Sequence, residues 1–162
     1  MHSKPPQRAA RSAMHAALAG VFCLSAAVTH AQSTAQVPAE QSAGEVQFRV
    51  GGIGETEADA MRSISTEYPL ALTFVERSSD GRDMFTADVD VSIVDSNGSA
   101  QLDTVAGGPI LLADLPDGRY TVSATLDGDT KTQQVTVSEG ATQRVVFVWP
   151  EQQTSQQLSR AD

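Results

Sequence analysis

The sequence predicts a mainly β protein, a sandwich of antiparallel strands with one short helix near its start. Residues 87–93 and 120–126 alternate apolar and polar side chains with a period of two, as half-buried antiparallel strands do. Turn-forming pairs such as Asn97-Gly98 and Asp127-Gly128 separate the apolar runs. Because these short strands follow one another closely, without alternating helices, a sandwich is favoured over a parallel sheet.

The first 31 residues are typical of a cleavable secretory signal peptide. A basic start with Lys4, Arg8 and Arg11 precedes an Ala-rich apolar stretch, and small residues then lead to a cleavage point before Gln32. The apolar stretch is short for a membrane span, so an uncleaved anchor is the less favoured alternative. We therefore expect a periplasmic or secreted protein that has no membrane contact after cleavage.

Three further segments follow the signal. Residues 32–44 and 150–162 are polar and without period, which predicts a disordered leader and a disordered tail. The sandwich domain is expected between them, over 45–149. Its strands are expected at 46–50, 70–75, 87–93, 101–105, 110–112, 120–126, 133–137 and 145–149. Two of these, 70–75 and 145–149, are apolar on both faces, which is typical of central or well-covered strands.

Residues 55–65 interrupt the strand pattern. Acidic residues open the segment, and Ala58 and Met61 follow at helical spacing, so we expect a short helix here. Two roles are open to it. It could cap an open sheet edge, which is the favoured interpretation because uncovered edges invite aggregation, or it could present a surface to a partner.

The residues lost with the signal restrict the chemistry of the mature chain. Cys23 is the only cysteine, and His2, His15 and His30 are the only histidines. Their removal excludes nucleophilic sites that need an imidazole base and metal sites built on His or Cys. It also excludes disulfides. We expect no cofactor.

The charge of the mature chain is strongly negative. Three of the 11 basic residues leave with the signal, so 8 remain against 20 acidic residues, a formal charge of −12. Such a surface repels nucleic acid and anionic headgroups, which excludes both as partners. The favoured interpretation is that the charge keeps an exported domain soluble.

The segment 110–137 carries the pattern L-P-x-G-x-Y-x-V, at Leu115, Pro116, Gly118, Tyr120 and Val122. This stretch resembles the carboxypeptidase regulatory-like domain, which implies a seven-stranded, transthyretin-like or Ig-like sandwich. In metallocarboxypeptidases that domain is an appendage beside a separate zinc-bearing catalytic domain, so the resemblance implies no peptidase activity. The turn itself is a folding device, because Pro116 presets a turn conformation and Tyr120 can return its hydroxyl to nearby backbone.

The Gly-rich segment 51–55 (GGIGE), followed by Met61, resembles the start of a group of small exported bacterial proteins of unknown function. A phosphate cradle is the alternative for these glycines. It lacks the lysine and hydroxyl residue of a P-loop, and Glu55 and Glu57 place negative charge where an anion would sit. A flexible turn before a helix is therefore favoured.

Many aspartates raise the question of carboxylate chemistry. Asp80 with Asp83, or Asp127 with Asp129, could contribute to a calcium site, but neither pair matches a twelve-residue calcium loop. A carboxylate pair could also hydrolyse glycosides, a remote alternative. Turn formation is the favoured role for these residues.

These observations predict a non-enzymatic binding or accessory module, with a protein partner in the bacterial envelope favoured over a carbohydrate. A sugar site usually needs an exposed aromatic ring, and this chain has few. Tyr120 and Phe147 occupy expected core positions, which leaves Tyr68 and Trp149, near element ends, as candidate ligand contacts.

Overall fold

A computed structural model describes residues 36–151 of the chain. The predicted signal peptide, and the predicted tail beyond Glu151, lie outside the described residues. The described part holds helix α1 (Glu55–Ile64), a 3-10 turn η1 (Ser65–Glu67) and ten strands. The strands are β1 (Gln41–Ala43), β2 (Val46–Gly51), β3 (Leu70–Arg77), β4 (Asp83–Phe85), β5 (Val89–Asp95), β6 (Ala100–Ala106), β7 (Ile110–Asp114), β8 (Gly118–Leu126), β9 (Asp129–Val137) and β10 (Gln143–Pro150).

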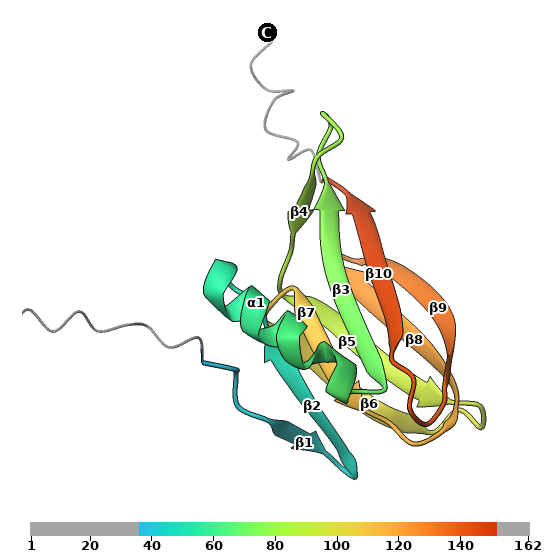
Figure 1. Cartoon of the computed structure of the whole chain (residues 1–162). Coiled ribbons are helices and arrows are strands. Elements are labelled where there is room, and N and C mark those ends of the chain that lie inside the picture. Colours follow the sequence, from blue (N-terminus) through green and yellow to red (C-terminus); the bar gives the residue numbers. More distant parts are fainter. Residues whose placement is uncertain (1–35, 152–162) are drawn as a thin grey trace, which may run out of the picture. The chain divides into compact units, whose positions relative to one another are not determined.

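The strands form two sheets. Sheet A has the order β1-β2-β7-β3-β10, with β4 also paired to β3, and sheet B has the order β6-β5-β8-β9 (Figure 1). All pairs are antiparallel except that of β3 with β10, which run parallel with Leu72 opposite Val145. No helix within residues 36–151 is long and apolar enough to cross a membrane.

The predicted mainly β architecture with one short helix is confirmed, and each of the eight segments with a strand pattern forms a strand. The expected number of seven strands is wrong, since the described residues contain ten. The two strands that lie outside the eight expected segments, β1 and β4, have three residues each, which is too short to show a period of two. Because β1 pairs with β2, regular structure begins inside the segment expected as a disordered leader.

The expectation of a central or well-covered strand at 145–149 is also wrong. β10 lies at the edge of sheet A and, among the described strands, pairs with β3 alone. Its inward side chains Val145, Phe147 and Trp149 are buried, whereas Val146 on the opposite face is 52% exposed. Both faces of β10 are apolar, as the sequence shows, but only one of them is buried. An apolar pattern on both faces therefore does not by itself predict that both faces are covered.

The main core lies between the two sheets. Phe74, Phe147 and Trp149 from sheet A form an aromatic cluster with ring centroids 6.0–6.4 Å apart. Sheet B contributes residues such as Val91 and Val122, which are also buried. Burial of these side chains is the main stabilising contribution in a chain with no disulfide among its described residues.

Helix α1 covers the outer face of sheet A (Figure 1). Ala58 and Met61 of the helix pack against Ala71 of β3 and against Ile110 and Leu112 of β7. These strands are internal in the sheet, so the helix covers a face and not an edge. The favoured edge-capping role is therefore wrong. The apolar outer side chains of β7 and β3 explain the position, because they need cover from water.

Candidate functional site

The loop that leads into α1 is held by a carboxylate. Gly52 and Ile53 donate their backbone N–H groups to Oε1 of Glu57, at 2.7 and 3.2 Å. Gly52 adopts a φ of +96°, which a residue with a side chain rarely tolerates. Because Glu57 occupies these donors, the loop has the predicted role of a turn before a helix and offers no cradle for a phosphate. It also directs the side chain of Ile53 into solvent, with 64% exposed.

A second exposed apolar side chain faces the same helix. Phe85 ends β4, opposite Val75 of β3, so both side chains lie on the outer face of sheet A. Its ring is 58% exposed. Arg62 of α1 reaches over this ring, with the guanidinium carbon 5.7 Å from the ring centroid, a favourable cation–π arrangement. The same arginine is paired with Asp59 at 2.6 Å.

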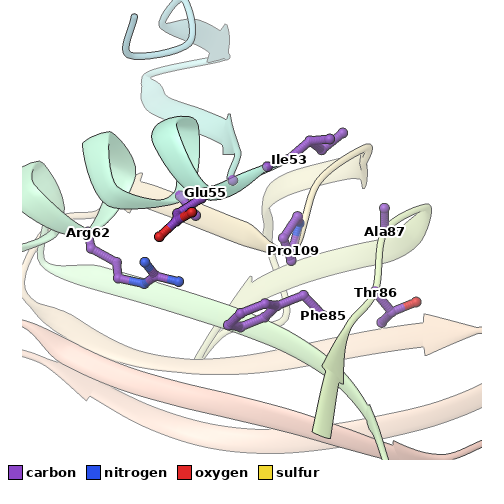
Figure 2. A pocket seen from close by; sticks show the side chains of 10 residues that line it. Ile53, Glu55, Arg62, Phe85, Thr86, Ala87 and Pro109 are labelled. Atoms are coloured by element: carbon purple, nitrogen blue, oxygen red, sulfur yellow. The ribbon is translucent and has the colours of Figure 1, made fainter. Parts of the chain in front are cut away.

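Between these side chains lies a cavity of about 530 Å³, which we call the α1 cleft. Its walls are residues 52–55, Ala58 and Arg62 of the helix, residues 85–87 and Pro109 (Figure 2). Apart from Glu55 and Arg62, the lining carries no charge. A largely apolar hollow with a few polar groups at its rim is the usual form of a binding site.

A second cavity of about 420 Å³ lies on the other side of the Arg62–Phe85 contact, and both residues line it too. Ile110 and Leu112 form part of its apolar wall, and Arg144 and Val146 of β10 bound it. The two cavities thus flank one cation–π pair. Together they place an apolar surface with positive charge on the outer face of sheet A.

The two aromatic residues predicted as ligand contacts are both buried. Trp149 is fully enclosed in the main core and donates its Nε1–H to the carbonyl oxygen of Asp129, at 2.9 Å. Tyr68 is 8% exposed. Its hydroxyl accepts a hydrogen bond from Arg49 (2.6 Å) and donates one to Glu40 (2.8 Å). Neither ring is free to stack on a sugar, so this prediction is wrong.

Sequence reasoning missed Phe85 and Ile53, the most exposed apolar residues of the cleft. Phe85 stood outside every predicted strand, and an unassigned aromatic residue between the Asp80-Gly81 turn and the strand predicted from residue 87 is a signal that could have been used. Ile53 is the one apolar residue inside the Gly-rich loop. Its exposure depends on the hydrogen bonds to Glu57, which no sequence pattern shows.

The predicted structural turn has the expected form. The Tyr120 ring is buried, and its hydroxyl donates to the carbonyl oxygen of Pro116 at 2.7 Å. Burial raises the pKa of Tyr120. Leu115 is buried in the main core, and Gly118 begins β8 directly against the Tyr120 ring. This turn is therefore a packing device in the wall of the sandwich.

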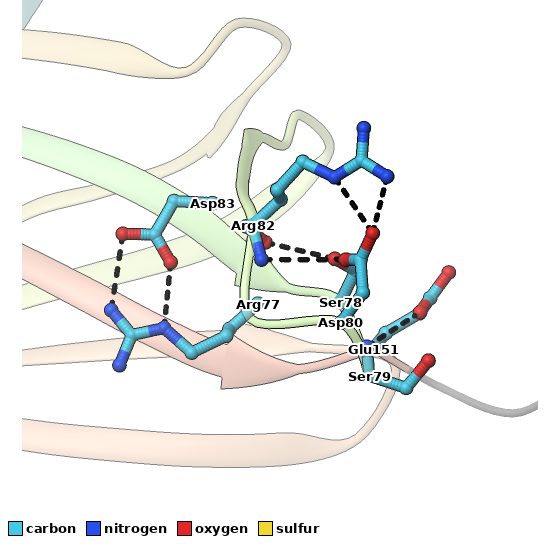
Figure 3. A network of polar contacts seen from close by, with 7 residues as sticks. All are labelled: Arg77, Ser78, Ser79, Asp80, Arg82, Asp83 and Glu151. Carbon is cyan, nitrogen blue, oxygen red and sulfur yellow. Dashed lines mark hydrogen bonds and ion pairs between the residues drawn. The ribbon is translucent and has the colours of Figure 1, made fainter.

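Of the two aspartate pairs considered for calcium, Asp80 and Asp83 have arginine partners (Figure 3). In the other pair, Asp127 and Asp129, the carboxylate of Asp129 lies 3.8 Å from the amine of Lys131. Asp83 accepts two hydrogen bonds from Arg77, which lowers the pKa of this carboxyl group. Asp80 accepts from Ser78 and Arg82, and these bonds lower its pKa as well. Within residues 36–151, no group of three or more His, Cys, Asp or Glu side chains is arranged to hold a metal ion.

Comparison with known proteins gives no family. No family model matches the chain, and no curated protein matches it. Several solved structures are similar in part, among them the following two. One is a candidate carbohydrate-binding protein from Pseudomonas aeruginosa, 14% identical over 56% of this chain and 95% of that chain, with a TM-score of 0.34. The other is BcpA, the major pilin subunit of Bacillus cereus, 19% identical over 49% of this chain and 27% of that chain, with a TM-score of 0.29. Both TM-scores lie below 0.5, and neither likeness bears on function.

Proposed function

We propose that this chain is a non-enzymatic protein-interaction module of the bacterial envelope, which holds an apolar side chain of a partner protein in the α1 cleft. The observation that supports it is the pair Ile53 and Phe85, two large apolar side chains exposed at the rim of one cavity. Single exposed apolar residues are ordinary, but a pair around a hollow is typical of an interaction site.

The charges of the cleft favour a protein partner. Arg62 and Glu55 offer one positive and one negative group beside the apolar lining, so a partner segment can combine an apolar anchor with polar neighbours of either sign. Aromatic residues and arginines are the residue types that contribute most to protein interfaces. The acidic character of the whole chain also disfavours nucleic acid and anionic lipid.

Two matched variants test the proposal. Phe85→Ser removes the aromatic wall of the cleft, and Val105→Ser removes a side chain of the same exposure, 58%, on the outer face of sheet B. We expect a partner captured from an envelope extract to be retained at least about tenfold less by Phe85→Ser, since a central anchor contributes about 2 kcal/mol or more. Val105→Ser should retain it as the wild type does. Equal retention by both variants would contradict the proposal.

Carbohydrate binding is the second candidate, and one observation favours it. Phe85 is an exposed aromatic ring with Glu55, Arg62 and Thr86 as polar neighbours around the same cavity, an arrangement that sugar sites use. Against it, Arg62 already lies over the ring. A polysaccharide array with the same variants separates the candidates. Glycan binding that is lost in Phe85→Ser and kept in Val105→Ser would replace the protein partner by a sugar.

Export and the absence of catalysis belong to the same proposal. The tripartite signal supports cleavage before Gln32, and sequencing the exported protein from its N-terminus checks it; an intact Met1 on membrane-bound material would contradict it. The loss of every His and Cys with the signal supports a non-enzymatic role. Turnover of glycosides or peptides that one carboxylate substitution abolishes would contradict that role.

The relation to the carboxypeptidase regulatory-like domain also stays a proposal. It is supported by the turn motif from Leu115 to Tyr120, whose hydroxyl bond to Pro116 closes the turn. An experimental structure in which the core strands follow the order of a transthyretin-like domain would support the relation, and a different order would refute it.

A further inference from the structure

The open edge of β10 has an arrangement that suits one kind of partner. Gln143 and Glu151 donate their N–H groups to the carbonyl oxygens of Pro69 and Arg77, on the β3 side. Successive residues of a strand direct their backbone groups to opposite edges. The N–H and C=O groups of Arg144, Val146 and Val148 therefore face away from β3, and within residues 36–151 no strand pairs with them.

Among the edge strands, β10 carries the charged Arg144 near its first position and Pro150 at its last, and no protective feature between them. β1 and β4 have three residues each. β6 has an irregularity where it pairs with β5, and β9 is polar along most of its length and carries Lys131. Proteins use short strands, bulges and lysines to keep edges from pairing. β10 has eight residues, with Val146 and Val148 on its outer face, so it is the edge best suited to accept a strand.

The chemistry of the edge indicates its occupant. Only an extended backbone can pair with N–H and C=O groups that recur at every second residue. Arg144 is exposed and makes no ion pair with another described residue, and it lines the same cavity as Arg62. An incoming strand therefore meets positive charge at Arg144, followed by apolar surface at Val146 and Val148.

A second copy of the chain fits this edge less well. Two antiparallel β10 strands related by a two-fold axis through Val146 would place Arg144 opposite Val148 of the other copy, which forms no new ion pair. The two chains are also both acidic, with a formal net charge of −12 each after the signal is removed, and repel one another. Charge complementarity thus favours a different protein with a carboxylate in its strand.

We propose that the open edge of β10 binds an extended segment of a partner protein as an added strand. In this segment apolar β-branched residues lie beside Val146 and Val148, and an acidic residue lies beside Arg144. The inference rests on the proposed interaction function, but it uses a backbone edge in place of the α1 cleft. Strand addition extends sheet A by one strand, and alternate side chains of the partner come to lie on its outer face.

The test uses two peptides, acetyl-TETVTVT-amide and its reverse, because the direction of pairing is open. Each carries one glutamate and two valines on one face. Added at about 1 mM, a concentration suited to weak peptide binding, one of them should shift the NMR signals of the Arg144, Val146 and Val148 amides. The same peptide with N-methylated amides should not, because it cannot pair. An absence of edge shifts with both peptides would overturn the proposal.

Charge reversal tests the role of Arg144. Replacing the peptide glutamate by lysine should weaken binding to the wild type about fivefold, and Arg144→Glu should reverse this preference. Val146→Pro, which removes an edge N–H, should abolish binding, while Val146→Thr keeps it. Peptide-induced NMR shifts that gather at Phe85 instead of the β10 edge would overturn the proposal. So would hydrogen-exchange protection of the edge amides that rises with protein concentration in the absence of peptide, since it would show that a second copy occupies the edge. Phe85→Ser leaves the β10 edge intact. Failure of this variant to retain the captured partner therefore concerns the α1 cleft, whereas failure of the wild type to bind the peptides concerns the β10 edge.

Discussion

The outer faces of the two sheets differ in how they meet water. On sheet B, the hydroxyl oxygens of Ser123 and Thr132 lie 3.1 Å apart, and those of Thr125 and Thr130 lie 2.8 Å apart. Hydroxyl pairs thus connect β8 to β9. On sheet A, Leu112 and Ala71 lie under α1, and beyond the helix Phe85 and Val146 are exposed. Apart from Val105, the outer face of sheet B is polar and needs no cover, whereas that of sheet A is apolar and only partly covered.

This difference distinguishes the surfaces that the fold needs for stability from the surface that is open to a partner. Both sheets share one inner core, so each needs its inner face for stability. The polar side chains on the outer face of sheet B are hydrated by water, so this face needs no further layer. On sheet A the helix covers the apolar side chains of β7 and β3 but leaves two cavities along its side. A surface of this kind is expected to bind something, since apolar side chains around a hollow gain from a partner.

The largest expected effect concerns stability under the helix. Leu112→Ala leaves a void between α1 and sheet A, because Leu112 is fully buried there. We expect a loss of about 2–5 kcal/mol in the free energy of unfolding, as measured with urea. Thr125→Ala, on the outer face of sheet B, should cost less than about 1 kcal/mol. Equal losses would show that the two outer faces do not differ as described.

An intermediate effect is expected from the two buried tyrosines. Tyr68→Phe removes a hydroxyl that contacts the charged side chains of Arg49 and Glu40, and should cost about 1.5 kcal/mol. Tyr120→Phe removes the single bond to the Pro116 carbonyl, and should cost about 1 kcal/mol. Thermal unfolding checks both. A larger loss of stability for Tyr120→Phe would contradict this order. It would show that the hydroxyl bond to Pro116 contributes more to stability than the contacts of Tyr68 with Arg49 and Glu40.

The smallest effect concerns pH. Backbone N–H groups of Ser99 and Asn97 donate to Asp95 and lower its pKa, and Arg77 lowers the pKa of Asp83. A carboxyl group with a lower pKa in the folded chain stabilises the fold above its unfolded pKa, and this contribution is lost as the pH falls through the folded value. Both contributions should therefore decline below about pH 4.

The variants Asp95→Asn and Asp83→Asn check this by urea midpoints measured between about pH 2 and pH 5. Each should lower stability at the upper end of this range and flatten the decline on acidification. Added salt should weaken the contribution of Asp83, which rests on an exposed ion pair, more than that of Asp95. A decline that neither substitution changes would assign the acid sensitivity to other carboxyl groups.

Much of the fold was predictable from the sequence, because it rests on local patterns. The period of two at 120–126 predicted β8, and the acidic start of 55–65 predicted α1. The site was not predictable in the same way. Phe85 reaches the outer face only through the pairing of β4 with β3, and Trp149 is buried because the second sheet covers it. Such outcomes depend on contacts between distant segments, which a single sequence does not show.

Site-specific photo-crosslinking in cells shows directly whether the outer face of sheet A is the interaction surface. A photoreactive phenylalanine derivative is placed at Phe85 in one variant and at Val105 in another, two positions of equal exposure on opposite outer faces. We expect a discrete crosslinked protein at position 85 and none at position 105. Crosslinks at position 105 alone, or the same pattern at both positions, would contradict the claim that the outer face of sheet A is the interaction surface.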